Sequence, residues 1–117
     1  MIPVNVRIFV CTEPVDMRRG FDSLALLARE QLQQDPRSGA LLIFTGRRRD
    51  RLKALWWDRN GYCILYKRFH QSVFELPAPL EGERGGVSVR IDGQKLAVLL
   101  AGQAKARRSK AKLRVVR

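Results

Sequence analysis

The 117-residue sequence is short of the side chains that most catalytic and metal sites require. It holds one histidine, His70, and two cysteines, Cys11 and Cys63, which are too far apart for a C-x-x-C site. No cysteine or carboxylate stands at ligand spacing from His70, and the sequence contains no glycine-rich phosphate loop and no recognisable Ser/His/Asp or Cys/His arrangement. We therefore predict no catalytic residue, no metal site and no cofactor.

Long apolar runs and an export signal are also missing. No stretch approaches the ~18 apolar residues of a transmembrane helix, and the N-terminus lacks the basic, apolar and small-residue order of a signal peptide. Nothing else suggests secretion, so we expect Cys11 and Cys63 to be reduced, packed thiols. These features predict a cytoplasmic protein with no membrane partner.

Acidic residues are scarce in comparison with basic ones. The chain has 11 Asp and Glu against 23 Lys and Arg, for a net charge of +12. Such an excess indicates a partner rather than a fold, and the commonest partner is nucleic acid, whose neutralised phosphates release counterions. Seven of the basic residues lie in residues 103–117, which contain no acid. We expect residues 1–102 to form one domain and residues 103–117 to be a disordered basic tail.

The apolar pattern predicts mainly strands. With 45% apolar residues, the chain can bury one modest core. Helical spacing begins at Phe21 and should end after Asp35, because Pro36 follows, and a second helix over residues 93–101 would have Asp92 as its N-cap. Strands are predicted at residues 4–11, 40–45, 51–57, 62–69 and 87–91, with a short edge strand at 73–76. The predicted fold class is α+β: an antiparallel β-sheet with a helix after the first strand and a short C-terminal helix packed on one face.

The stretch Gly46–Phe69 joins basic charge and large aromatic residues more closely than any other part of the chain. Five basic residues precede Trp56 and Trp57, and Asn60-Gly61 is a strong signal for a β-hairpin. Basic side chains contact phosphates, and aromatic faces stack on unpaired bases at roughly 1–3 kcal/mol each. Neighbouring strand residues point to opposite faces, so one tryptophan should lie on the open face of the sheet. Two alternatives remain: both tryptophans pack into small cores above a solvated arginine loop, or the surface binds a protein.

Four aspartates could in principle gather around magnesium for phosphoryl transfer. Asp16 and Asp22 stand where helix caps belong, and Asp50 and Asp58 stand at turns. Capping and turn formation explain all four without a metal. A metal-dependent nuclease that uses Asp16, Asp50 or Asp58 is therefore the least favoured hypothesis.

Several motifs together resemble a known family. They are DMRRGFDSLA at residues 16–25, DPRSG at 35–39, GRRRDRLKALWWDRNGYC at 46–63, KRF at 67–69 and LAVLLAG at 96–102. In order and spacing they are similar to the TnpB-type accessory protein of the IS-sixty-six group of bacterial insertion sequences, which is distinct from the RNA-guided nucleases also called TnpB. The resemblance covers residues 1–102. The chain departs from the family pattern at Ser23, Thr45 and Leu76.

The resemblance implies a small protein that supports transposition beside a separate transposase, and it brings no catalytic residue. Together with the charge pattern, it predicts a nucleoid-associated accessory protein whose partners are DNA and the transposase encoded by the same element. The alternative is a protein adaptor that docks on the transposase without touching DNA. The predicted nucleic-acid-binding residues are Arg18, Arg19, Arg47, Arg48, Arg49, Arg51, Lys53, Trp56, Trp57, Lys67 and Arg68 in the domain, with Lys105, Arg107 and Arg108 in the tail.

Overall fold

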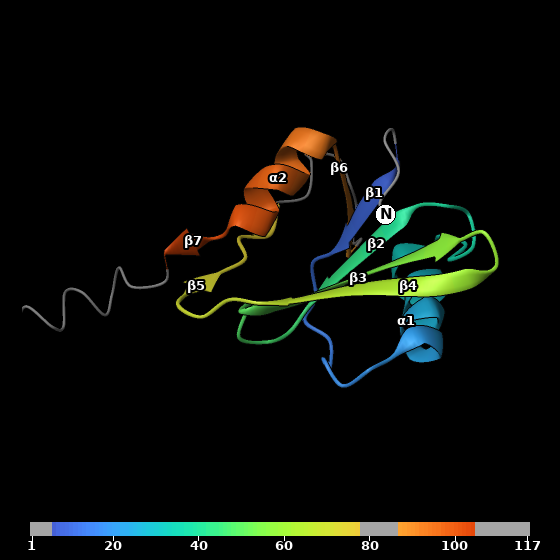
Figure 1. Cartoon of the computed structure of the whole chain (residues 1–117), viewed down its shortest axis with the longest axis horizontal. Coiled ribbons are helices and arrows are strands. Elements are labelled where there is room, and N and C mark those ends of the chain that lie inside the picture. Colours follow the sequence, from blue (N-terminus) through green and yellow to red (C-terminus); the bar gives the residue numbers. More distant parts are fainter. Residues whose placement is uncertain (1–5, 78–86, 105–117) are drawn as a thin grey trace, which may run out of the picture.

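The structure is a computed structural model that describes residues 6–77 and 87–104 (Figure 1). Predicted residues outside these ranges, including Lys105, Arg107 and Arg108, are not placed. None of the helices within these ranges has the length and apolar content that a membrane crossing requires. The elements in chain order are β1 (Ile8–Cys11), α1 (Phe21–Leu27), η1 (Ala28–Leu32), β2 (Leu41–Thr45), β3 (Arg51–Asp58), β4 (Gly61–Arg68), β5 (Ser72–Val73), β6 (Ser88–Ile91), α2 (Gly93–Ala101) and β7 (Gln103–Ala104).

A five-stranded sheet in the order β4-β3-β2-β1-β6 forms the centre of the molecule. The predicted α+β class is confirmed, but the sheet is mixed, because β1 and β2 are parallel. The helical connection between them returns the chain to the same end of the sheet, so β2 enters in the direction of β1. Every other strand pair within the described residues is antiparallel. A second, two-stranded sheet pairs β5 with β7. β7 lies where the disordered tail was expected to begin.

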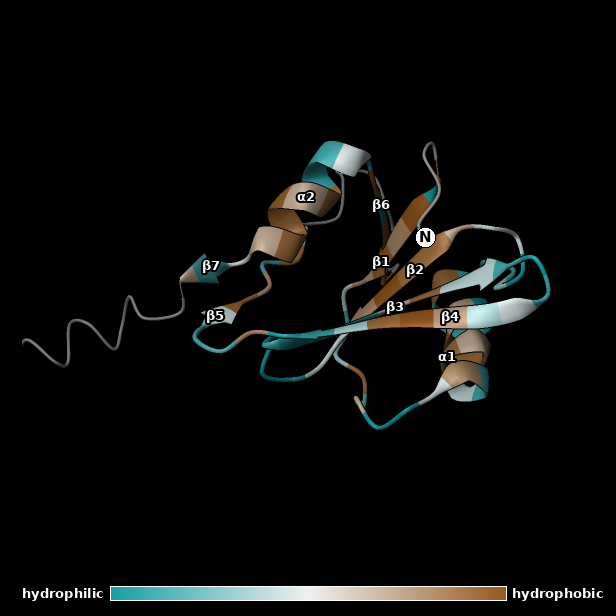
Figure 2. Ribbon diagram, in the orientation of Figure 1, coloured by the Kyte–Doolittle hydropathy of each residue, from teal (hydrophilic) through white to brown (hydrophobic). Residues whose placement is uncertain are grey.

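Both faces of the five-stranded sheet are covered, each by a different helix (Figure 1). Ile43 and Trp56 pack with Leu99 of α2 in one apolar cluster. Phe44 packs with Leu24 of α1 in another. The two helices therefore lie on opposite faces of the sheet. The prediction that they pack on one face was wrong. Figure 2 shows the apolar residues concentrated in the middle of the sheet and on the helices beside it.

The helix ends follow local signals, with one correction. The carboxylate of Asp92 accepts a hydrogen bond of 2.8 Å from the backbone N–H of Lys95, so the predicted N-cap of α2 is confirmed. The first helix continues from α1 into the π-helical turn η1 and ends at Leu32, three residues before the predicted end. Gln33 takes a left-handed conformation with φ of 54°, which stops the helix before Pro36 can.

The predicted hairpin is confirmed as β3 and β4. Its strands pair from Arg51 opposite Arg68 to Asp58 opposite Gly61. Arg59 and Asn60 therefore form a two-residue turn, in which Arg59 has a positive φ of 62°. Successive side chains of each strand alternate between the α1 face and the α2 face.

The two cysteines are free thiols, as predicted. Cys11 is buried in the cluster on the α1 face, whereas Cys63 packs against the cluster on the α2 face. The sheet lies between them, so the fold keeps the two sulfur atoms apart. Burial raises the pKa of the Cys11 thiol, since the charged thiolate would lose its hydration there.

Candidate nucleic-acid interface

Two loops meet at one end of the sheet and form an open groove of about 530 Å³. The segment after β1 is fixed to the end of β2, because the backbone N–H of Val15 donates to the carbonyl of Thr45 at 2.9 Å. Gly46 allows this close approach, since a Cβ atom there would lie 2.8 Å from the Cγ atom of Met17. We call this site the arginine groove. It is lined by Pro14, Val15, Asp16, Met17, Arg18, Gly46, Arg47, Arg48, Asp50 and Arg51.

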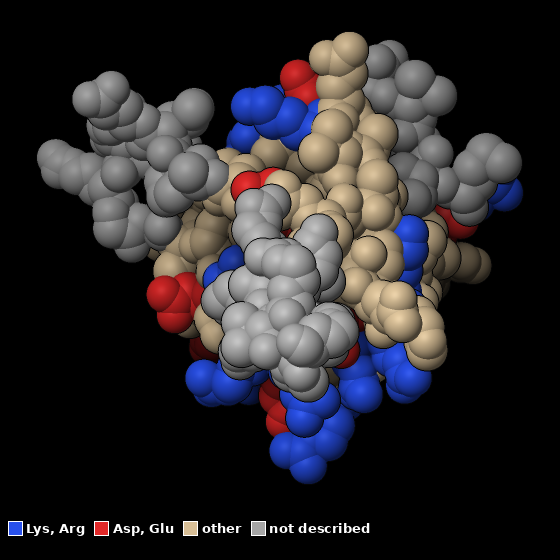
Figure 3. Space-filling view, turned by 90° about the vertical axis from the view of Figure 1, so that its left-hand side faces the viewer, with Lys and Arg blue, Asp and Glu red and all other residues tan. Residues whose placement is uncertain are grey.

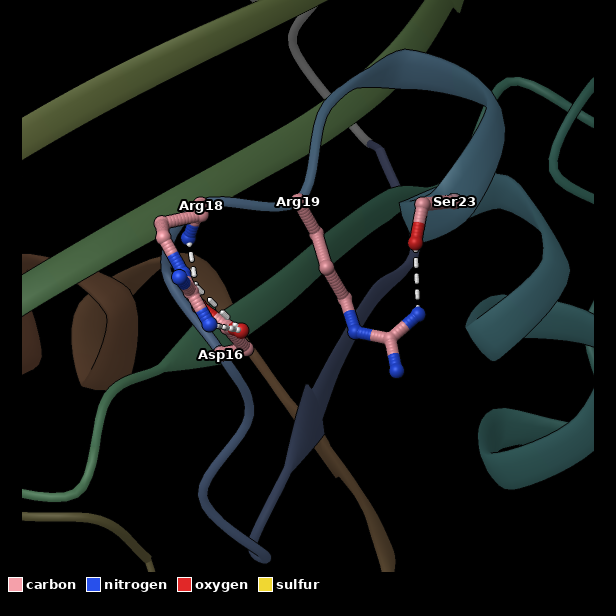
Figure 4. Close-up of polar contacts among 4 residues, drawn as sticks. All are labelled: Asp16, Arg18, Arg19 and Ser23. Atoms are coloured by element: carbon pink, nitrogen blue, oxygen red, sulfur yellow. Dashed lines mark hydrogen bonds and ion pairs between the residues drawn. The ribbon is translucent and has the colours of Figure 1, made fainter.

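Asp16 and Arg18 form an ion pair on one wall of the arginine groove (Figure 4). The Arg18 guanidinium donates to the Asp16 carboxylate through Nε at 3.0 Å and Nη2 at 2.8 Å. The backbone N–H of Arg18 also donates to Oδ1 at 2.9 Å. These hydrogen bonds hold the pKa of Asp16 well below its ordinary range and raise the pKa of Arg18. Asp16 therefore shapes the turn, and part of the Arg18 charge is neutralised by it.

The opposite wall is the loop between β2 and β3, whose backbone is fixed while its side chains are exposed. Arg49 has a positive φ of 63°, and its N–H donates to the carbonyl of Gly46 at 3.0 Å. The carbonyl of Arg49 accepts from the backbone N–H of Phe74 at 2.7 Å. In the part of the chain that the structure describes, no hydrogen bond or ion pair engages the side chain of Arg47 or Arg48. Figure 3, which looks at the end of the molecule that carries β5 and β7, shows Lys and Arg side chains gathered along its lower side.

A basic and aromatic surface continues from the arginine groove along the hairpin, on the α1 face. Arg51 is paired across the ladder with Arg68, and Lys53 with Tyr66. The Lys53 ammonium donates to the carbonyl of Arg19 at 2.7 Å and lies 4.8 Å from the centre of the Tyr66 ring. Tyr66 is 51% exposed. We call these four strand residues, Arg51, Lys53, Tyr66 and Arg68, the open platform.

Neither tryptophan belongs to the open platform. The two rings do point to opposite faces, as predicted, but Trp56 is only 7% exposed in the cluster beneath α2. Trp57 is half-buried between the guanidinium of Arg37, 4.6 Å from its ring centre, and the ring of Tyr62 at 4.9 Å. The expectation of a tryptophan on an open face is thus corrected, because α2 covers Trp56 and the side chains of Arg37 and Tyr62 cover Trp57 in part. Alternation along β4 was the signal that could have identified Tyr66 instead.

Lys67 is also separated from the open platform, since neighbouring strand residues point to opposite faces. Its ammonium donates to the carbonyl of Leu100 at 2.7 Å, at the C-terminal end of α2. It also lies 4.9 Å from the centre of the Phe69 ring. A cation in this position stabilises the unpaired carbonyls and the negative end of the helix dipole. The contacts of Lys67 are those of a structural residue.

The structure therefore brings together only part of the predicted set. Arg19 stands between the arginine groove and α1, where its guanidinium donates to the hydroxyl of Ser23 (Figure 4). Arg49 is exposed in the loop between the two surfaces. The predicted residues that line the arginine groove or the open platform are Arg18, Arg47, Arg48, Arg51, Lys53 and Arg68.

The three aspartates of the nuclease hypothesis are not assembled into one site. Asp16 and Asp50 both line the arginine groove, but Asp16 is bound by Arg18. Asp58 stands at the far end of the hairpin from Arg51. Within residues 6–77 and 87–104, no three histidine, cysteine or acidic side chains are close enough to hold a metal ion together.

Comparison with known proteins identifies the family. The chain belongs to the IS66 Orf2-like proteins, whose family model matches residues 6–110. It is 39% identical over 98 residues to the uncharacterized protein y4hO of Sinorhizobium fredii (strain NBRC 101917 / NGR234), covering 84% of this chain and 81% of that protein. A second uncharacterized protein of the same organism, y4jC, is 32% identical over 98 residues, covering 84% and 80%. No solved structure matches the chain.

Family membership defines an accessory role associated with an insertion sequence, and the family is not known as a catalytic one. The predicted resemblance is thereby confirmed. The match continues past Gly102, where the resemblance had ended, to residue 110. It therefore includes Lys105, Arg107 and Arg108 of the basic tail.

Proposed function

We propose that this protein is an accessory DNA-binding factor that supports transposition of its insertion sequence, with the arginine groove as its phosphate-binding site. The observation that carries the proposal is the exposure of the Arg47 and Arg48 side chains. Both are exposed at the end of a fixed loop, and no side-chain partner engages them among the described residues. Guanidinium groups that none of the described side chains engages are available to bind phosphate oxygens in the bidentate geometry that suits them.

The charge balance of the arginine groove supports the same proposal. Four arginines and two aspartates line it, and one of the aspartates is already paired with Arg18. Lys53 and Arg68 extend the positive surface along the open platform. An excess of cations that extends from the arginine groove along the open platform favours an anion with several charges, such as a nucleic-acid backbone.

Ala104, the last described residue of the chain, lies at the same end of the molecule as the arginine groove. Ala104 pairs with Ser72 of β5. Phe74, which directly follows β5, donates its backbone N–H to the carbonyl of Arg49 in the loop between β2 and β3. Ala104 therefore lies near the loop that carries Arg47 and Arg48. We propose that Lys105, Arg107 and Arg108, which follow Ala104, add phosphate contacts to those of the arginine groove.

A charge-neutralising double variant tests the proposal. Arg47→Gln/Arg48→Gln removes two phosphate contacts, so the slope of log affinity against log salt concentration should fall in magnitude by roughly 1.4–1.8. The matched control is Arg7→Gln/Arg59→Gln, which removes the same charge at the opposite end of the sheet. Fluorescence anisotropy with labelled DNA between ~50 and ~200 mM salt measures both slopes. A groove variant that behaves like the control would place the phosphate contacts elsewhere.

The alternative function, an adaptor for the transposase, is favoured by a different observation. Phe21 and Leu26 of α1 are 50% and 52% exposed, although both are large apolar residues. Such residues serve protein interfaces when they gather with others. If the wild-type protein binds no DNA at ~50 mM salt but co-purifies with the transposase of its own element, and Leu26→Glu abolishes this association, the adaptor function is the correct one.

A further inference from the structure

The hairpin is covered on its α1 face along only part of its length. Leu55 is buried in the α1 cluster, and Ile64 and Tyr62 pack against that cluster from β4. Farther toward the arginine groove, the ladder continues through Lys53 opposite Tyr66. There the exposed fraction of the tyrosine rises to 51%. The open platform is thus a piece of sheet face that neither α1 nor α2 covers.

The Tyr66 ring is held in position from one side and exposed on the other. The Lys53 ammonium lies 4.8 Å from the ring centre, a distance suited to a cation–π interaction. The hydrogen bond from Lys53 to the carbonyl of Arg19 fixes that ammonium in turn. A ring that is oriented before the ligand arrives loses less conformational entropy on binding than a freely rotating one.

Cations connect the exposed ring to the arginine groove. Arg68 is two residues from Tyr66 on the same strand, so its side chain leaves the same face of the sheet. Arg51 is its cross-strand partner and also lines the arginine groove. If a nucleic-acid strand binds its phosphates in the arginine groove, the next nucleotide along the strand would therefore lie beside Tyr66.

We propose that the ligand of this surface is single-stranded DNA, with an unpaired base stacked on Tyr66 and the neighbouring phosphates bound by Arg51, Arg68 and the arginine groove. This inference rests on the DNA-binding function proposed above and names its substrate class. In a duplex, base pairing and stacking hide the faces of the bases, so an exposed ring beside the phosphates contributes little. Unpaired bases present their faces, and stacking on an aromatic side chain tolerates any sequence.

Three labelled DNA probes separate the contributions of base and phosphate. We choose an oligo-dT strand of about 20 nucleotides, a duplex of the same length, and a strand of equal length with abasic sites in place of its bases. The protein should bind oligo-dT more tightly than either other probe. Tyr66→Ala should weaken oligo-dT binding by roughly 5-fold to roughly 150-fold and leave abasic binding unchanged, because only the base contacts the ring.

Two variants control the measurement. Tyr66→Phe keeps the ring and should retain oligo-dT affinity to within about twofold. Val98→Ala removes another exposed apolar side chain, 69% exposed on α2 and thus on the opposite face of the sheet, and should have no effect. Thermal unfolding followed by circular dichroism checks that each variant is folded.

The outcomes distinguish this inference from the proposed function. Duplex binding as tight as oligo-dT binding, or a Tyr66→Ala variant with wild-type affinity for oligo-dT, overturns the single-strand inference while leaving DNA binding in place. Failure to bind any of the three probes at ~50 mM salt overturns both.

Discussion

Gly102 holds the end of α2 against the hairpin, and replacing it with alanine should destabilise the fold strongly. Gly102 has φ of 79° and ψ of 174°, a backbone region that is accessible almost only to glycine. A Cβ atom there would overlap the Phe69 ring, at 2.6 Å from its Cε2 atom. The ring cannot easily move, because it lies 4.2 Å from the ring of Phe74 and its own backbone N–H is bound to Asp50.

The magnitude follows from these two effects. Forcing alanine into this backbone region costs about 1–3 kcal/mol, and crowding a packed ring costs about 1–3 kcal/mol more. The loss of unfolded-state entropy on replacing glycine offsets about 0.4–1 kcal/mol. Gly102→Ala should therefore lower the free energy of unfolding by roughly 1–6 kcal/mol, compared with the ~5–15 kcal/mol of a typical domain.

Urea unfolding followed by tryptophan fluorescence measures this change, with Gly93→Ala as the matched control. Gly93 has no atom within 4 Å of an added Cβ and no positive φ, and it is the first residue of α2. Alanine at Gly93 should stabilise the protein by about 0.4–1 kcal/mol, because it reduces the conformational entropy of the unfolded chain. If the free energy of unfolding of Gly102→Ala is within about 0.5 kcal/mol of the wild-type value, the close contact between Gly102 and Phe69 is not part of the native fold.

Three further predictions separate structural from functional residues. Lys67→Met should lower stability by about 0.5–1.5 kcal/mol through loss of the hydrogen bond to Leu100, while DNA affinity by anisotropy changes less than about twofold; a large affinity loss would return Lys67 to the binding surface. Trp56→Ala should lower the free energy of urea unfolding by about 3–5 kcal/mol, because the ring is buried, and near-wild-type stability would contradict that burial. The pKa of the Asp16 carboxyl group, measured by NMR, should lie below its ordinary value of 3.8, because hydrogen bonds from Arg18 favour the charged form. The charged carboxylate stabilises the fold above the ordinary pKa, and this stabilisation is lost as the pH falls through the lower pKa of the folded state, so Asp16→Asn should flatten the acid side of the stability curve. An Asp16 pKa at its ordinary value would show that the ion pair is absent in solution.

Much of the fold could be predicted from local sequence signals. The hairpin followed from Asn60-Gly61 between two apolar runs, and the limits of α2 followed from Asp92 and Gly102. The buried central strand over residues 41–45 followed from a continuous apolar run. Each of these features depends on residues that are close in sequence, so the pattern itself contains the physical cause. The family was likewise readable from motifs that lie in order along the chain.

The candidate site could be predicted only in part. The loop over residues 46–50 was visible as a run of charge, and its position beside Asp16 and Arg18 was not, because the two segments are about 30 residues apart. Trp56 and Trp57 drew attention by their size, but α2 and Arg37 cover them. Tyr66 is a smaller signal in the sequence and became the exposed aromatic residue of the hairpin, since neither α1 nor α2 packs over it.

The basic character of this protein, its α+β class, its hairpin and its family follow from the amino-acid order, because composition, side-chain period and motif order are properties of the chain alone. Which face of each strand is open depends on the tertiary structure. Exposure depends on what a distant segment covers: α2 buries Trp56, and Arg37 covers Trp57 in part. These contacts leave Lys53, Tyr66 and Arg68 as the open surface beside the arginine groove.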